Sequence, residues 1–225
     1  MYVSTVGNAV DSLETSAQFA GRSDPLKWKW VAIAAHHSLY SFCIAALHNS
    51  SQADVLTWAR GKHDSGDWYQ GGSDPIWYRS RRDEVDGSPA YRIRWEATTE
   101  APPADSKTAK GNPRLIDFWT ALARVQDPMC WMGNRLTTRA LTLTDEEMLD
   151  IAWLADAVRN QLMHFTPKGY LISISSVMSS VAVVLRAVEF LALQSHSIIS
   201  AEEGWQTRAA SACVELRDAL DAASM

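Results

Sequence analysis

The chain has 225 residues, of which 47% are hydrophobic and 21% are charged, a balance typical of a globular protein that can bury a core. Its formal net charge of −5 argues against a protein that binds nucleic acid over most of its surface, although a small basic cleft is compatible with it. The three cysteines are far apart and form no Cys-x-x-Cys pair, which disfavours both a disulfide framework and a cysteine-based zinc site.

The N-terminal segment, residues 1–22, predicts a short helix or arm, with Val10, Leu13 and Phe19 as its apolar positions. It has no basic stretch followed by an apolar run, so a secretory signal peptide is not expected.

A long helix is predicted next, from about Leu26 to His48. Its start is marked by Ser23-Asp24-Pro25, a capping residue followed by proline at the first helical position. The segment is apolar almost all round, which indicates a helix in the middle of the fold.

Residues 51–113 have a different character and predict an insertion. They contain several turn signals, namely Gly71-Gly72, Asp86-Gly87, Pro102-Pro103 and Gly111-Asn112-Pro113. From Tyr91 to Trp95 apolar residues alternate with arginines, which is the pattern of a half-buried strand. We expect one hairpin here and a disordered tip near 101–110.

The rest of the chain predicts helices over 115–125, 144–165, 172–194 and 201–222, with a connection of undefined structure over 127–143. Capping boxes that begin at Thr144 and Ser200 mark two of the starts. The expected fold class is therefore all-α, a helical bundle that forms a single domain over 1–225. The helices over 144–165 and 172–194 are joined by a short loop and should be antiparallel neighbours.

Two segments, Trp30–Leu47 and Leu171–Leu193, are apolar enough to compare with membrane spans. A span needs ~20 apolar residues with few charges. The first segment carries two histidines near its centre and the second carries an arginine and a glutamate. We expect buried bundle helices, a cytoplasmic protein and no membrane partner.

The most specific pattern lies at the end of the helix predicted over 144–165. Asp156, Asn160 and His164 are spaced by four residues and share one face of a straight helix. Arg159 lies ~100° around the helix from Asn160, at the edge of that face. At the last turn, the helix dipole favours the protonated form of His164.

These residue types suit phosphodiester chemistry. A histidine moves protons near neutral pH, and an arginine offers a planar fork to phosphate oxygens and to the charge that develops at phosphorus. Asn160 or Asp156 would orient the imidazole. RNA carries its own nucleophile, the 2′-hydroxyl, so no metal or other cofactor is required. Since one His and one Arg are few for two proton transfers, a two-fold dimer is expected to bring two copies together.

This Arg-Asn-x-x-x-His arrangement on a helical bundle resembles the HEPN superfamily. The resemblance implies an HEPN-like bundle and a metal-independent endoribonuclease, with Arg159 and His164 catalytic, Asn160 assisting and Asp156 supporting. It also implies a homodimer, an RNA substrate, and a role as a toxin with a cognate antitoxin or in antiviral (antiphage) defence. It covers the motif and its helical context but not residues 51–113.

Two other interpretations stay open. The same residues can belong to a non-catalytic helical module that binds RNA, a nucleotide or a partner protein. Alternatively, Arg159 pairs directly with Asp156 and His164 caps its own helix, in which case the bundle has no site.

Arginines and aromatic residues alternate in the insertion and suggest a second RNA contact. An arginine–aromatic surface can hold a single strand by charge and stacking. Acidic neighbours dilute the charge, so a solvated hairpin over the bundle is the competing interpretation. The candidate RNA-binding residues are Arg79, Arg81, Arg82, Arg92 and Arg94.

No metal site is predicted. His36 and Cys43 share a face of the first long helix, as do His37 and His48, but the members of each pair are more than ~10 Å apart along the axis. Polar groups satisfied inside the bundle are the expected role. His37 is kept as a secondary candidate for the same cleft as His164.

Overall fold

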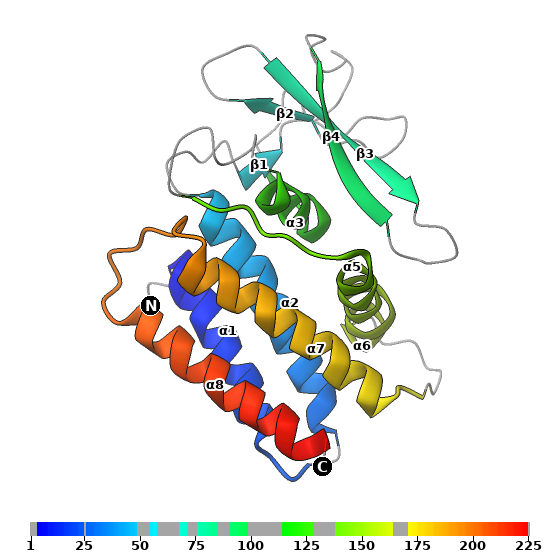
Figure 1. Cartoon of the computed structure of the whole chain (residues 1–225), viewed down its shortest axis with the longest axis vertical. Coiled ribbons are helices and arrows are strands. Elements are labelled where there is room, and N and C mark those ends of the chain that lie inside the picture. The colour runs from blue at the N-terminus through cyan, green and yellow to red at the C-terminus, as the bar shows by residue number, and fades with distance from the viewer. Residues whose placement is uncertain are drawn as a thin grey trace.

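The computed structural model is mostly helical, and its helices gather into one bundle with small antiparallel sheets at one end (Figure 1). This confirms the predicted predominance of helix. The structure describes residues 4–24, 26–48, 55–57, 68–71, 76–84, 91–98, 114–127, 138–163 and 171–224.

Two long helices, α1 (Thr5–Ala20) and α2 (Lys27–Leu47), open the chain and pack against each other. Ser4 caps α1, since its hydroxyl accepts a hydrogen bond of 2.8 Å from the amide of Gly7. Before α2, the carboxylate of Asp24 accepts a hydrogen bond from the amide of Leu26. The Ser-Asp-Pro pattern therefore predicts this start to within one residue.

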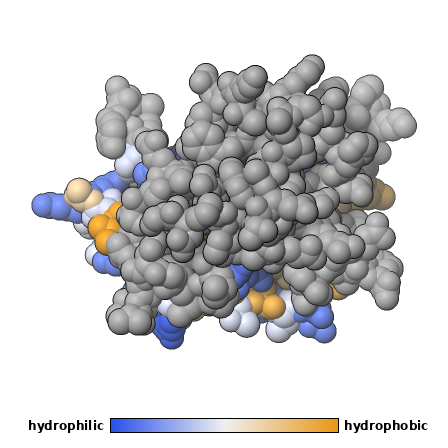
Figure 2. All heavy atoms as spheres, turned by 90° about the horizontal axis from the view of Figure 1, so that it is seen from above, coloured by the Kyte–Doolittle hydropathy of each residue, from blue (hydrophilic) through white to orange (hydrophobic). Residues whose placement is uncertain are grey.

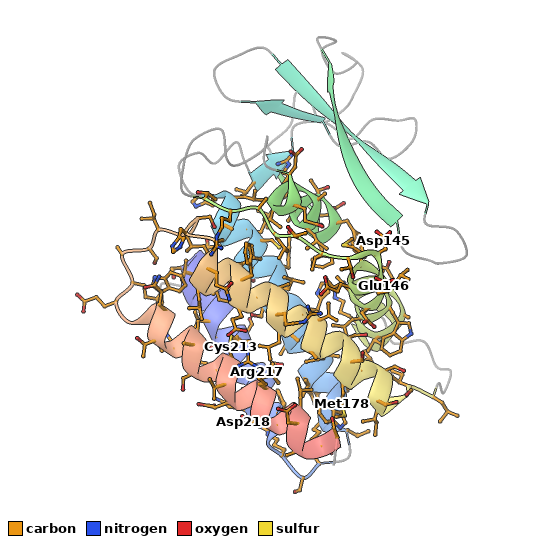
Figure 3. The ribbon with its side chains drawn as sticks, viewed as in Figure 1. Asp145, Glu146, Met178, Cys213, Arg217 and Asp218 are labelled. Carbon is orange, nitrogen blue, oxygen red and sulfur yellow. The ribbon has the colours of Figure 1, made fainter. Side chains whose placement is uncertain are left out.

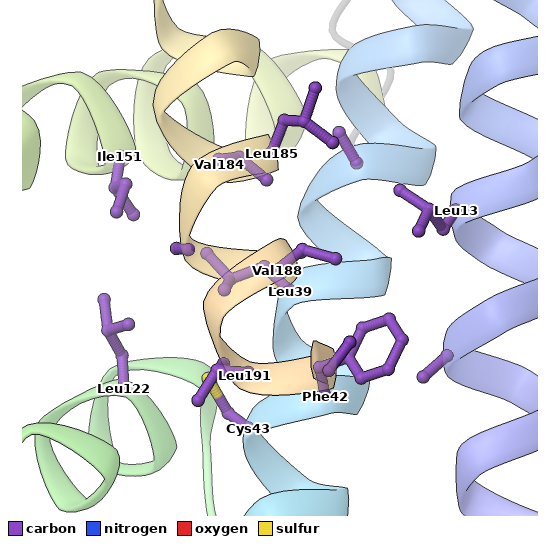
Figure 4. Close-up of a cluster of buried hydrophobic side chains, with 14 of the residues drawn as sticks. Leu13, Leu39, Phe42, Cys43, Leu122, Ile151, Val184, Leu185, Val188 and Leu191 are labelled. Carbon is purple, nitrogen blue, oxygen red and sulfur yellow. The ribbon is translucent and has the colours of Figure 1, made fainter. Parts of the chain in front are cut away.

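Helix α2 is the central helix of the bundle, as its sequence predicts. It contacts α1, α3 and α7 and the π-helical segment described below, and its side chains are buried on nearly every side. Figure 4 shows Leu39, Phe42 and Cys43 of α2 surrounded by apolar side chains of the neighbouring helices. The buried apolar side chains of α2 therefore form part of the hydrophobic core along the length of the helix.

Two described helices are long and apolar enough to cross a membrane by length and composition, Lys27–Leu47 and Ile174–Gln194. Inside the bundle, 78% of the most apolar window of the first and 56% of that of the second are buried. A buried core helix passes the same test, so the finding is weak evidence for a membrane. The cytoplasmic location stays a prediction.

The predicted insertion contains three paired strands. Strands β2 (Trp68–Gly71), β3 (Ile76–Glu84) and β4 (Tyr91–Thr98) form an antiparallel sheet in the order β2-β3-β4. The hairpin expected around Tyr91–Trp95 is β3–β4, and β2 adds a strand to it. Strand β4 contacts α3. The tip expected near 101–110 lies outside the described residues.

A second, two-stranded sheet joins the two ends of this segment. Strand β1 (Leu56–Thr57) pairs with β5 (Arg114–Leu115), so that Leu56 lies opposite Leu115. The amide of Ile116 also donates to the carbonyl of Val55, 3.0 Å away. The chain therefore leaves the bundle after α2 and returns to it at the same place.

The remaining elements are α3 (Phe118–Gln126), α5 (Asp145–Ala152), η3 (Trp153–Arg159), α6 (Asn160–Met163), α7 (Ile174–Glu189), η4 (Phe190–Gln194) and α8 (Trp205–Ser224). The capping box at Thr144 is confirmed at the start of α5. Contacts between α5 and α7 follow an antiparallel order, because Glu147 pairs with Arg186 whereas Asp150 accepts from Ser180. The predicted antiparallel arrangement of these helices is thus confirmed.

The prediction of one continuous α-helix over 144–165 is wrong in its middle. Residues 153–159 form a π-helix, η3, in which the amide of Asn160 bonds to the carbonyl of Ala155, five residues earlier. This hydrogen-bond pattern adds one residue to the turn and shifts the faces of the residues that follow. Asp156 and Asn160 of the predicted stripe still meet through a side-chain hydrogen bond, and His164 lies outside the described residues.

The predicted start of the last helix is also wrong. The hydroxyl of Ser200 accepts from the amide of Glu202 in a local turn and does not cap a helix. Gly204 then adopts a positive φ of 72°, and α8 begins only at Trp205.

Candidate functional site

Three of the four motif residues lie together at the junction of η3 and α6, and all three are half-buried. The guanidinium of Arg159 donates from Nη1 to Oδ1 of Asn160 over 2.8 Å. The amide of Asn160 in turn donates from Nδ2 to Oδ1 of Asp156 over 3.3 Å. This chain of hydrogen bonds orients the guanidinium and links it, through the side chain of Asn160, to the carboxylate of Asp156.

The direct Arg159–Asp156 pair, which the competing interpretation requires, is replaced by a contact that passes through Asn160. Asn160 therefore orients the arginine, whereas the sequence suggests that it orients the histidine. His164, the proposed proton-transfer residue, lies outside the described residues, and its position beside Arg159 stays a prediction.

The structure places two histidines of α2 near Arg159. Helix α2 contacts η3, and the positive charge of Arg159 acts on both imidazoles. The pKa of His36 falls to about 3, first because the side chain is buried and then because of Arg159 and His37. The pKa of His37 also falls, through loss of surrounding water and then through Arg159.

His36 is a core residue. Its side chain is 7% exposed, and its ring packs on Phe118 with 4.3 Å between the ring centroids. With a pKa of about 3 the imidazole is uncharged near neutral pH. The expectation that this histidine lies inside the bundle is thus confirmed.

His37 reaches solvent and is held from the neighbouring helix. Its Nε2 atom lies 3.1 Å from Nδ2 of Asn8 on α1, and the same Asn8 nitrogen donates to the hydroxyl of Ser41 over 3.1 Å. Because its pKa lies below the ordinary value of 6.5, His37 is mostly neutral at pH 7. An oriented, neutral and accessible imidazole therefore lies in the field of Arg159.

The predicted candidates differ in how far the sequence could place them. The Arg-Asn motif itself locates Arg159 and Asn160. His37 follows only as a secondary candidate, since no spacing rule connects α2 with the motif helix. No sequence pattern indicates Asn8 as its partner, and none indicates that Arg124 of α3 is fully buried.

The histidine and cysteine pairs of α2 do not assemble a metal site. Burial raises the pKa of the Cys43 thiol far above its ordinary value and so disfavours the thiolate that binds zinc. Among the described residues, no three His, Cys, Asp or Glu side chains are grouped closely enough to hold an ion.

The five candidate arginines of the insertion lie on β3 and β4. Arg79 is paired with Glu96, Arg81 with Arg94, and Asp83 with Arg92. Since directly opposed positions share a face of a sheet and neighbouring positions alternate, positions 79, 81, 92 and 94 lie on one face and 82 on the other. By the same register, positions 83 and 96, which are acidic, fall on the face of those four.

The end of the molecule that carries the insertion is shown in Figure 2. The coloured side chains visible at its edges are mainly hydrophilic, with a few hydrophobic ones. The candidate site at the η3–α6 junction rests on the bundle and not on this end.

Comparison of the chain with protein-family models, with curated proteins and with solved structures found no match.

Proposed function

We propose that this protein is a metal-independent endoribonuclease of HEPN type. In this proposal Arg159 binds the scissile phosphate, His164 transfers protons, Asn160 orients Arg159 and Asp156 supports that orientation. The observation that supports it is the Arg159–Asn160–Asp156 chain of hydrogen bonds, which holds a half-buried guanidinium beside the imidazoles of α2.

The guanidinium retains donors for a ligand. An arginine has several N–H donors in a planar fork that matches phosphate oxygens. Within the described part of the chain, the side chain of Arg159 uses one of them, towards Asn160. The remaining edge of the fork is suited to two oxygens of one phosphate.

The reaction follows from the substrate. The 2′-hydroxyl oxygen of RNA attacks the adjacent phosphorus and gives its proton to a base, while the bond to the 5′-oxygen breaks and that oxygen takes a proton from an acid. The products are a 2′,3′-cyclic phosphate and a free 5′-hydroxyl. Histidine serves either step near neutral pH, and Arg159 stabilises the charge that grows on the phosphate.

The resemblance to HEPN proteins extends the proposal to a homodimer that acts as a toxin, with an antitoxin partner, or in antiphage defence. A second candidate function is a non-catalytic module that binds RNA, a nucleotide or a partner protein. The formal charge of −5 and the carboxylate of Asp156 near Arg159 favour the partner-protein form of this alternative.

Incubation of the purified full chain with an end-labelled single-stranded RNA, with and without EDTA, tests the proposal. Cleavage that persists in EDTA and is lost in Arg159→Ala and His164→Ala supports it. Arg217→Ala is the matched control, because Arg217 lies on α8, across the bundle from α5, and pairs with Glu189 of α7 (Figure 3). RNA binding without cleavage supports the second function, and no interaction with RNA contradicts both RNA-directed forms.

A further inference from the structure

We propose that His37 and Arg159 bind the same phosphate group, in a site formed where α2 meets η3. The inference rests on the proposed function in one respect, since it takes the ligand to be a phosphodiester of RNA. It adds a ligand residue from a second helix, which the motif alone does not contain.

Arg159 and His37 lie on two helical segments that contact each other. Helix α2 packs against η3, and Arg159 acts electrostatically on both histidines of α2. His36 is shielded from a ligand, because it is buried against Phe118. His37 is the imidazole that reaches solvent, so an anion held by Arg159 finds His37 and not His36 at its side.

The imidazole of His37 is oriented by a hydrogen-bond contact with α1. Within the described residues, the one hydrogen-bond contact of His37 joins its Nε2 to Nδ2 of Asn8. The Asn8 nitrogen also donates to Ser41, which assigns it as the donor of the amide. Nε2 of His37 then accepts, and the neutral ring carries its proton on Nδ1. The Nδ1–H group is therefore a donor that no described residue occupies.

Charged groups on the elements that pack against α2 determine the electrostatic surroundings of His37. Arg159 is the charged group that lowers the pKa of His37. On α1, which packs against α2, Glu14 pairs with Arg208 and Asp11 also acts on Arg208. At the start of α3, the carboxylate of Asp117 caps the helix and, after burial, helps to raise the pKa of Tyr40. On α7, Arg186 and Glu189 are paired elsewhere.

The carboxylate of Asp156 is linked to Arg159 through Asn160, so it offsets the positive charge at His37 in part, and a phosphate would neutralise the rest. The bound anion accepts from Nδ1–H and favours the imidazolium form, in which the added proton is on Nε2 and the hydrogen bond from Asn8 is given up. Phosphate binding and proton uptake by His37 are therefore coupled, and the coupling requires Arg159.

The test follows the histidine ring signals of the full-length protein by NMR during pH titrations, with and without inorganic phosphate. We expect phosphate to raise the pKa of His37 in the wild type and to leave it unchanged in Arg159→Gln. His48, exposed at the other end of α2, is the internal control for non-specific effects. A shift of His48 equal to that of His37, or no shift of His37, overturns the inference.

RNA affinity provides a second, independent measurement. We expect His37→Gln to weaken binding of a non-cleavable 2′-O-methyl RNA about tenfold, the loss of one hydrogen bond to a charged group. His48→Gln should bind like the wild type. If the coupled shift occurs but RNA is never cleaved, the phosphate site stands and the nuclease proposal fails. If RNA is cleaved, but phosphate leaves the pKa of His37 unchanged and His37→Gln binds RNA like the wild type, the nuclease proposal stands and this inference fails.

Discussion

Asn160 accepts a hydrogen bond from the guanidinium of Arg159 over 2.8 Å, although the two residues are adjacent in the sequence. Adjacent residues on an α-helix do not face each other. Here η3 ends at Arg159 and α6 begins at Asn160, so the change from π-helix to α-helix falls between them. π-Helical turns occur frequently at functional sites, where they redirect one side chain.

The first prediction concerns this contact. In Asn160→Ala the guanidinium of Arg159 loses the acceptor that orients it, and Asp156 loses its link to the arginine. We expect RNA cleavage, or RNA binding if there is no cleavage, to fall about tenfold. Thermal unfolding should be followed in parallel, since a variant that is inactive because it is unfolded would show a lower Tm. A fully active, folded variant would show that Asn160 has no part in the site.

The second prediction concerns the electrostatic link between η3 and α2. Burial is the largest cause of the lowered pKa of His36 and His37, and the positive charge of Arg159 lowers both further because a nearby cation disfavours the imidazolium form. Arg159→Gln removes that charge while it keeps a polar side chain. Both pKa values should rise, as measured by NMR, and those in Arg217→Gln should match the wild type. Unchanged values in Arg159→Gln would mean that the guanidinium lies away from α2.

The third prediction is a pH dependence of stability. His36 has a pKa of about 3 in the folded chain and an ordinary value of 6.5. Between these values the unfolded chain binds a proton that the folded chain does not, so stability is complete above pH 6.5 and is lost as the pH falls towards 3. The loss is about 1.4 kcal/mol per pH unit within this window.

Urea unfolding at pH 7 and at pH 5 measures this effect. The free energy of unfolding should fall further between these pH values in the wild type than in His36→Gln, by about 2 kcal/mol. His48→Gln, altered at an exposed position of the same helix, should behave like the wild type. Equal pH dependence in all three proteins would show that His36 is not buried in its neutral form.

The fourth prediction compares two leucines. Leu39 of α2 is completely buried in the core of which Figure 4 shows a part, whereas Leu171 before α7 is fully exposed. Leu39→Ala removes apolar contacts and leaves a cavity, so the free energy of unfolding should fall by about 2–5 kcal/mol. Leu171→Ala should change it by less than about 0.5 kcal/mol. Similar losses in the two variants would place α2 outside the centre of the core.

Local signals in the sequence predict most helix positions. The capping box at Thr144 acts within one turn of the chain and is seen in the structure, whereas α2 begins at Lys27 with Leu26 as an N-cap that has no side-chain hydrogen bond, and Asp24 accepts from the amide of Leu26. Ser200 carries the same kind of signal, but Gly204 with its positive φ delays α8 by several residues. The π-helical segments η3 and η4 have no comparable signal, because apolar spacing fits a π turn and an α turn almost equally well.

The sequence predicts the residues that the η3–α6 junction contributes to the candidate site, but not those that α1 and α2 contribute. The Arg-Asn motif is contiguous, so the sequence indicates Arg159, Asn160 and Asp156 together. Their neighbours on α2 and α1 are more than a hundred residues away in the chain, and their approach depends on how helices pack. Asn8 is the clearest case, since an asparagine in the middle of a helix gives no indication of the histidine that it contacts on the next helix.

The pairing of Leu56 with Leu115 holds the two ends of the inserted segment together. Since the segment between β1 and β5 begins and ends at neighbouring positions of one antiparallel ladder, its two ends stay together however many residues lie between. A change in its length therefore leaves α2 at the centre of the bundle, while the contact of β4 with α3 is open to change. The hydrogen bonds that join Arg159, Asn160 and Asp156 lie on helices outside this segment.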